Sequence, residues 1–130
     1  MKTGLLIFAL VVITFFVLPN LMMASAATDI SQNNFISNYK SRKTFVLLDV
    51  RTQAEFNQGH IKGAININHS DIGSQLGLIP KDKDIILYCR TGRRVAIAAN
   101  TLAKNGYENL YHLKGDITAC VRSNRPLTKK

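Results

Sequence analysis

The stretch Asp84-Ile85-Ile86-Leu87-Tyr88-Cys89, followed by Arg90-Thr91-Gly92-Arg93-Arg94, decides the fold of this chain. Its first part is the clearest strand in the sequence, because a run of β-branched, apolar and aromatic residues follows the turn at residues 80–83. Residues 95–104 are rich in alanine and predict a helix, which Asn105-Gly106 ends. A buried strand that leads through a short glycine-containing loop into a helix is typical of parallel α/β sheets.

Short apolar runs and amphipathic segments alternate on both sides of this unit. We expect further strands at residues 44–50, 64–67 and 110–113, and helices at residues 29–39, 52–59, 70–78 and 117–122. The helix at residues 52–59 has the strongest end signals, a Thr52-Gln53-Ala54-Glu55 capping box and a closing Gly59. The alternation predicts a parallel sheet with helices on both faces. Cys89 then lies at the carboxyl end of a strand, where such folds carry catalytic groups.

Residues 1–27 differ in composition from the rest of the chain. Lys2 is their only charge, residues 5–18 are apolar, and the small residues Ala24-Ser25-Ala26 come near the end. This pattern is typical of a cleaved secretory signal peptide, and an uncleaved membrane anchor is the alternative. We therefore expect residues 28–130 to fold as a single domain in the periplasm or another exported compartment, without stable membrane contact after cleavage.

The composition of the 130 residues excludes several classes of protein. With 46% apolar and 19% charged residues, the chain is neither disordered nor fibrous. The formal net charge of +9 is dispersed and no nucleic-acid module is recognisable, so we expect steering of anions rather than nucleic-acid binding. We expect no metal site, because two cysteines are too few for one and neither His69 nor His112 has a partner at ligand spacing.

The residues after Cys89 favour a reactive sulfur. The backbone N–H groups of a loop that enters a helix converge on an anion, and the positive end of the helix dipole adds to their field. Arg90, Arg93 and Arg94 add three guanidinium groups. Because cations at a helix N-terminus oppose the dipole, their placement indicates a function rather than a contribution to folding. The segment therefore suits a nucleophilic thiolate that faces an anionic substrate.

Two motifs resemble those of the rhodanese domain family. The first is Asp49-Val50-Arg51, then Glu55-Phe56, then Gly59-His60-Ile61-Lys62-Gly63-Ala64. The second is Cys89-x-x-Gly92-x-Arg94, with Asn105-Gly106-Tyr107 downstream. The resemblance runs from about residue 30 to residue 127, and it is closest to the exported single-domain subtype. It implies a rhodanese-like three-layer α/β fold with a central, mainly parallel sheet of about five strands flanked by helices.

The resemblance also implies a thiosulfate sulfurtransferase that needs no cofactor. Cys89 takes a sulfur atom from a small anionic donor, thiosulfate or a polysulfide, and holds it as a persulfide for a thiophilic acceptor. The substrate-binding residues are Arg90, Thr91, Gly92, Arg93 and Arg94, and the six-residue loop suits sulfur substrates rather than phosphate esters. The protein is expected to be a monomer. The alternative is a non-catalytic sulfur carrier or a redox-gated persulfide-binding module.

Three other residues of the first motif are expected to be structural. Asp49 ends a buried strand, and Arg51 lies four residues before Glu55, with which it can pair. His60 is expected to form a hydrogen bond in the turn before Ile61.

The chain departs from the family near its C-terminus. The family pattern Leu-x-Gly-Gly-Ile-x-x-Trp reads Leu113-Lys114-Gly115-Asp116-Ile117-Thr118-Ala119-Cys120 here. Aspartate tolerates a left-handed backbone better than most residues, so Asp116 in place of the second glycine should preserve the turn. Cys120 replaces the aromatic residue, whose lost packing must be compensated. Three interpretations of Cys120 stay open: a small buried apolar residue, a disulfide partner of Cys89, or a resolving thiol that relays sulfur.

Overall fold

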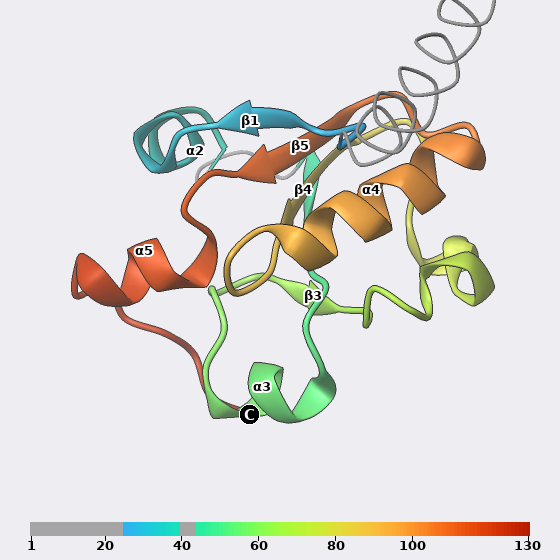
Figure 1. The fold of residues 1–130 in the computed structure, drawn as a ribbon. Coiled ribbons are helices and arrows are strands. Elements are labelled where there is room, and N and C mark those ends of the chain that lie inside the picture. Colours follow the sequence, from blue (N-terminus) through green and yellow to red (C-terminus); the bar gives the residue numbers. More distant parts are fainter. Residues whose placement is uncertain (1–24, 40–43) are drawn as a thin grey trace, which may run out of the picture.

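The computed structural model describes residues 25–39 and 44–130 of the chain. Five strands form one parallel sheet in the order β1-β5-β4-β2-β3, with β4 in its centre (Figure 1). The strands are β1 (Thr28–Ile30), β2 (Phe45–Asp49), β3 (Ile65–Asn66), β4 (Asp84–Tyr88) and β5 (Leu110–Leu113). The predicted parallel α/β sheet of about five strands is thereby confirmed.

The helices in the described part of the chain lie on both faces of this sheet. They are α2 (Gln32–Asn38), α3 (Gln53–Gln58), α4 (Arg93–Lys104) and α5 (Asp116–Arg122), with two short 3-10 helices, η1 (Ile72–Ser74) and η2 (Leu76–Leu78). The predicted capping box is present, since Thr52 Oγ1 accepts the Glu55 N–H and Glu55 accepts the Thr52 N–H.

The prediction of one helix over residues 29–39 was wrong in its first part. Asp29 pairs with His112 of β5 in a parallel register, so this segment is an edge strand rather than a helical turn. The helix begins only after Ser31, whose side chain accepts the N–H of Asn34 as an N-cap. The local spacing of apolar residues did not distinguish a helical turn from a strand at residues 28–30, because the strand forms only by pairing with a distant segment.

The predicted signal peptide lies almost entirely outside the described residues, which begin at Ser25. Within residues 25–39 and 44–130, the structure contains no helix with both the length and the apolar character needed to span a bilayer.

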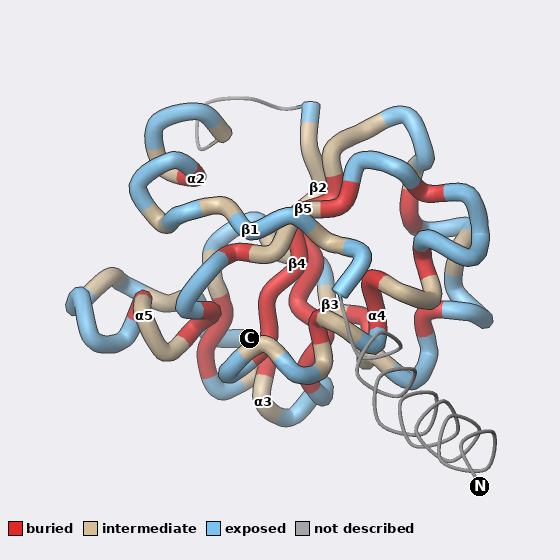
Figure 2. The backbone as a smooth tube through the Cα atoms, turned by 45° about the horizontal axis from the view of Figure 1, so that its top comes forward, coloured by how far each residue is buried: buried red, intermediate tan, exposed pale blue. Residues whose placement is uncertain are grey.

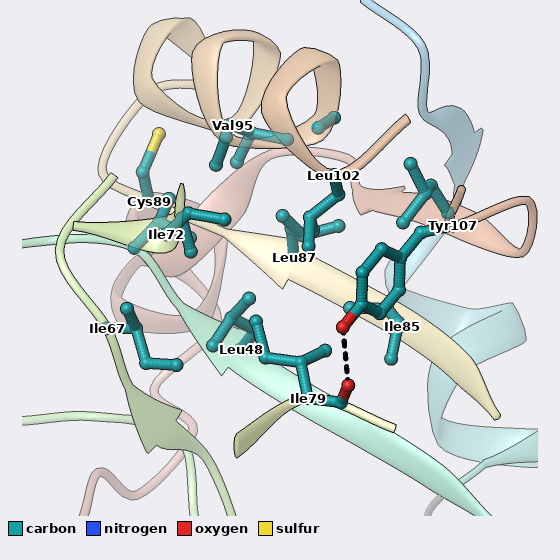
Figure 3. Packing of buried hydrophobic residues seen from close by; sticks show 14 residues of the cluster. Leu48, Ile67, Ile72, Ile79, Ile85, Leu87, Cys89, Val95, Leu102 and Tyr107 are labelled. Carbon is teal, nitrogen blue, oxygen red and sulfur yellow. Dashed lines mark hydrogen bonds between the residues drawn. The ribbon is translucent and has the colours of Figure 1, made fainter. Parts of the chain in front are cut away.

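Two apolar clusters lie on opposite faces of the sheet, because side chains alternate along β4. Ile85, Leu87 and Cys89 belong to the cluster beneath α4, whereas Ile86 and Tyr88 belong to the cluster beneath α2 and α5. Figure 2 shows the buried backbone concentrated in the central strands, with exposed positions on the outer turns of the helices. In Figure 3, Cys89 lies at one end of the α4-side cluster, with Tyr107 at the other. The fold thus places a cysteine where the central strand ends.

Candidate functional site

Cys89 is the first residue after β4, and its side chain is almost completely enclosed, with the residue 1% exposed. We call residues 89–94 the Cys89 loop. The Gly92 N–H donates a hydrogen bond to Cys89 Sγ at 3.0 Å. Gly92 is also the N-cap of α4, so the positive end of the helix dipole is directed at the sulfur. A thiolate is the form that such a donor and dipole stabilise.

Gly92 is required at its position for two reasons. Its φ of +108° lies in the region that favours glycine. A Cβ atom there would also lie 3.3 Å from His112 Cε1, since the loop passes close to β5. The tight turn that directs the Gly92 N–H at the sulfur therefore needs a residue without a side chain.

The three predicted arginines differ in their surroundings. Arg90 and Arg93 are exposed, as is Thr91. α4 begins at Arg93, two residues earlier than expected, so Arg93 and Arg94 both lie in its first turn. Arg94 is partly buried, and it donates to both carboxylate oxygens of Glu55 at 2.6 and 3.0 Å. Two arginines of the loop are thus open to solvent, and the third joins the loop to α3.

This ion pair corrects the expected pairing of Arg51 with Glu55. Arg51 precedes the N-cap of α3 and is not part of the helix, so the four-residue spacing along a helix surface does not apply. Arg51 instead binds the buried carboxylate of Asp49, with Nη2 at 2.7 Å, and the carbonyl of Gly59. The hydrogen bond from Arg94 lowers the pKa of Glu55 to about 2, more than partial burial raises it.

The structural roles expected for Asp49, Arg51 and His60 agree with their contacts. Asp49 is fully buried and accepts hydrogen bonds from the Arg51 side chain and backbone. His60 Nδ1 lies 2.8 Å from the carbonyl of Phe56, and the two rings are stacked. These contacts fix the turn that follows α3.

Sequence reasoning missed the residues of α5 that contact the Cys89 loop. Asp116 Oδ1 accepts the N–H of Cys89 at 2.9 Å, and the Ile117 N–H donates to the Cys89 carbonyl at 3.2 Å. Thr118 Oγ1 donates to the carbonyl of Arg90 at 2.7 Å. Asp116 departs from the family pattern, which was a signal for its role. The expectation that its backbone is left-handed is correct, with φ of +54°.

A cleft of about 460 Å³ opens beside the Cys89 loop between α3, α5 and the C-terminal segment. It is lined by Arg51, Glu55, Gln58, Gly59, Arg90, Ile117, Thr118, Val121 and Leu127. Arg90 is the residue of the Cys89 loop in this lining, so the cleft adjoins the loop on the α5 side.

Cys120 is buried in α5, and both cysteines are free thiols in this structure. Cys120 Sγ lies 3.4 Å from Gln32 Oε1, which also accepts a hydrogen bond from Arg125 Nη1 at 2.9 Å. Gln32 thus connects α2 to the C-terminal part of the chain, where the family pattern has an aromatic residue. Burial raises the pKa of the Cys120 thiol, and Arg125 offsets this only in part. These contacts favour the interpretation of Cys120 as a small packing residue over a reactive relay thiol.

Within the described ranges, no cluster of three or more His, Cys, Asp or Glu side chains is arranged to hold a metal ion. The donor that contacts the sulfur is instead the backbone amide of Gly92, a type of group that binds anions.

Comparisons with known proteins agree with this geometry. The model of the rhodanese-like domain family matches residues 32–123. A protein of Allochromatium vinosum named "Sulfurtransferase" is 38% identical over 82 residues, which cover 63% of this chain and 77% of that protein. "Thiosulfate sulfurtransferase GlpE" of Shewanella oneidensis is 30% identical over 82 residues, covering 63% of this chain and 81% of that protein. A crystal structure of a rhodanese-related protein from Thermoplasma volcanium is 26% identical, with a TM-score of 0.69, and the match covers 79% of this chain and 99% of the other.

Proposed function

Because this chain belongs to the rhodanese-like domain family, we propose that it is a sulfurtransferase that takes sulfane sulfur from thiosulfate through a persulfide on Cys89. The observation that carries the proposal is the hydrogen bond from the Gly92 N–H to Cys89 Sγ at the start of α4. The same donor and helix end that stabilise a thiolate also stabilise the outer sulfur of a persulfide anion.

The first half of the cycle forms the persulfide. The Cys89 thiolate attacks the outer sulfur of thiosulfate, and a new S–S bond forms on the protein. The S–S bond of thiosulfate breaks, and its electron pair leaves with sulfite. Arg90 and Arg93 are exposed residues of the loop, so their charges attract the thiosulfate dianion and compensate the negative charge on the oxygens of the departing sulfite.

The second half transfers the outer sulfur to an acceptor. With cyanide, the carbon attacks the outer sulfur and thiocyanate forms. The S–S bond to Cys89 breaks, and its electron pair returns to the sulfur of Cys89. The reaction needs no cofactor, because each step exchanges one nucleophile for another at sulfur.

Mass spectrometry of the intact protein before and after treatment with thiosulfate tests the first step. We expect a gain of the mass of one sulfur atom, mapped to the peptide that contains Cys89. Cys89→Ser should abolish both the adduct and the formation of thiocyanate. Cys120→Ser is the matched control and should retain most of the activity, since Cys120 contacts Gln32 rather than the loop. A wild-type protein that forms no adduct in the reduced state would refute the proposal.

Turnover separates the enzyme from a sulfur carrier. An enzyme produces many thiocyanate molecules per Cys89 thiol, whereas a carrier releases at most one. The comparison is informative because the Cys89 residue is buried, so an acceptor has to reach an enclosed side chain at each turnover.

We further propose that the protein acts in an exported compartment, on the basis of the composition of residues 1–27, and that it is a monomer there. Cell fractionation with N-terminal sequencing of the mature protein tests the export. An uncleaved chain, with residues 1–27 still present, in the cytoplasmic fraction would contradict export. Sedimentation equilibrium of the mature protein tests the oligomeric state.

A further inference from the structure

The buried carboxylate of Asp116 has no part in the sulfur-transfer steps above, yet it contacts the nucleophile's own backbone. Asp116 is 2% exposed, and its Oδ1 accepts the Cys89 N–H at 2.9 Å. The pairing of β4 with β5 ends at Leu87 and His112, two residues before Cys89. The Cys89 N–H therefore needs an acceptor from outside the sheet, and Asp116 provides it.

A buried carboxylate is costly unless a positive charge and hydrogen bonds compensate it. His112 does so, because its Nε2 lies 3.0 and 3.1 Å from the two carboxylate oxygens of Asp116. The other ring nitrogen, Nδ1, lies 2.8 Å from Asp29 Oδ1. Because ionised carboxylates only accept hydrogen bonds, these contacts are all satisfied when both ring nitrogens of His112 donate, which is the arrangement of the protonated ring.

The resulting chain of contacts runs from the edge strand to the nucleophile. Asp29 lies in β1 and is exposed, His112 lies in β5, and Asp116 begins α5. The hydrogen bond with Asp116 raises the pKa of His112, more than burial lowers it, and Asp29 adds to the rise. Contacts between His112 and the two carboxyl groups thus connect β1, β5 and α5 next to the Cys89 loop.

The contacts of α5 hold the beginning of the loop at consecutive peptide groups. Asp116 binds the N–H of Cys89, Ile117 binds its carbonyl, and Thr118 binds the carbonyl of Arg90. Because the Cys89 N–H is directed at Asp116, it is not available to the substrate. Of the backbone amides of the loop, only those further along can therefore bind the substrate anion. One of these, the amide of Gly92, already contacts the sulfur.

We propose that Asp116, neutralised by His112, is a positioning residue that holds Cys89 in the geometry required for sulfur transfer. This inference rests on the proposed function and deepens it. The backbone supports the assignment, because φ of +54° at Asp116 is a conformation in which the family's glycine would be free of strain. The Asp116 backbone is strained in this conformation, and its side chain provides an acceptor for the Cys89 N–H that glycine lacks.

The test compares Asp116→Gly with Asp116→Asn in the mature protein. Glycine suits the backbone and removes the acceptor, whereas asparagine keeps an oxygen that accepts the Cys89 N–H. Asp82→Gly, in an exposed turn before β4, is the control for the loss of an aspartate. Two quantities are measured: the single-turnover rate of persulfide formation with thiosulfate, and hydrogen exchange of the Cys89 amide. Melting temperatures confirm that each variant is folded.

In Asp116→Gly we expect persulfide formation to slow by about tenfold or more, because small displacements of a nucleophile have effects of this size. The Cys89 amide should exchange faster by about tenfold or more, as expected for the loss of its hydrogen-bond acceptor. Asp116→Asn should restore most of the rate and the protection. A purely structural role would change the melting temperature without this rescue.

Three results would overturn the proposal. The first is an Asp116→Gly variant that reacts at the wild-type rate. The second is an Asp116→Asn variant with a protected Cys89 amide that is as slow as Asp116→Gly. The third is a wild-type Cys89 amide that exchanges like an exposed one, a measurement that does not depend on the folding of any variant. A wild-type protein that forms no persulfide refutes the proposed function instead, and amide exchange still reports separately on the contact with Asp116.

Discussion

Arg94 and Glu55 form a two-pronged ion pair, in which Nη1 and Nη2 of the guanidinium each donate to one carboxylate oxygen, at 2.6 and 3.0 Å. The pair connects the first turn of α4 to the first turn of α3. Glu55 also accepts the Thr52 N–H in the capping box, so one carboxylate serves both contacts. The end of the Cys89 loop is therefore fixed by a charge on a different helix.

Glu55→Gln tests this contact, because glutamine maintains the capping box and removes the charge. We expect a loss of about 1 kcal/mol in the free energy of unfolding at neutral pH, which is typical of a well-formed, partly exposed ion pair. Because the pKa of Glu55 is lowered in the folded protein, this stabilisation is fully present above about pH 4.5 and is lost as the pH falls toward about 2. Urea unfolding at several pH values measures the difference between wild type and variant.

The exposed Glu108 provides the control, since Glu108→Gln removes a carboxylate far from α3 in the sequence. A difference between wild type and Glu55→Gln that stays constant from neutral pH into acid would show that the charge of Glu55 does not carry the effect.

Arg90 and Arg93 should act on substrate, in contrast to Arg94. Replacing either with glutamine should raise the KM for thiosulfate by about fivefold, because a solvent-exposed charge contact is worth about 1 kcal/mol. The effect should shrink as salt is added, because the charges are exposed. Arg94→Gln should lower the stability as Glu55→Gln does. Steady-state kinetics at low and high ionic strength, beside urea unfolding, separate these effects. A KM that is unchanged in both Arg90→Gln and Arg93→Gln would exclude their role in binding.

The central unit was predictable because its signals are local. The apolar run of β4, the glycine at the loop and the alanine-rich helix each specify their own conformation. The capping box of α3 was predictable for the same reason. The family motifs then identified Cys89 as the candidate nucleophile.

The parts that could not be predicted depend on contacts between distant segments. β1 is extended only because it pairs with β5, more than eighty residues later. Glu55 meets Arg94 only after the sheet has brought α3 beside the start of α4. The tolerance of Asp116 for a left-handed backbone followed from its residue type, but its acceptor role needed the position of Cys89 in space.

The ion pair between His112 and Asp116 should make the protein less stable as the pH rises. Its pKa is raised in the folded protein, so its contribution is fully present below the ordinary histidine value of about 6.5 and is lost as the pH passes the folded value. We expect His112→Gln to destabilise the protein most under mildly acidic conditions and least under alkaline ones. Urea unfolding from pH 5 to pH 9 gives this dependence.

His69→Gln is the comparison for this series, because His69 has no ion pair among the described contacts of the chain. If wild type and His112→Gln lose stability in parallel as the pH rises, the ion pair between His112 and Asp116 does not contribute to folding.

Two glycines with nearly the same φ angle allow backbone strain to be separated from steric crowding. Gly63 and Gly115 have φ of +89° and +87°, so alanine is strained at both by about 1 kcal/mol. A Cβ at Gly63 has no atom within 4 Å, whereas one at Gly115 lies 2.6 Å from the Cβ of Ala119. Gly115→Ala should therefore cost about 2 kcal/mol or more, twice the cost of Gly63→Ala or greater.

The added cost at Gly115 has a consequence for the site. Relief of the contact with Ala119 requires α5 to move, and α5 carries the three residues that bind the beginning of the Cys89 loop. We expect Gly115→Ala to slow persulfide formation, and Gly63→Ala to leave it near the wild-type rate. Urea unfolding and single-turnover mass spectrometry of both variants measure the two effects. If both variants lose the same stability, α5 moves away from the added Cβ without a measurable loss of free energy. If Gly115→Ala forms the persulfide at the wild-type rate, the Cys89 loop does not depend on α5.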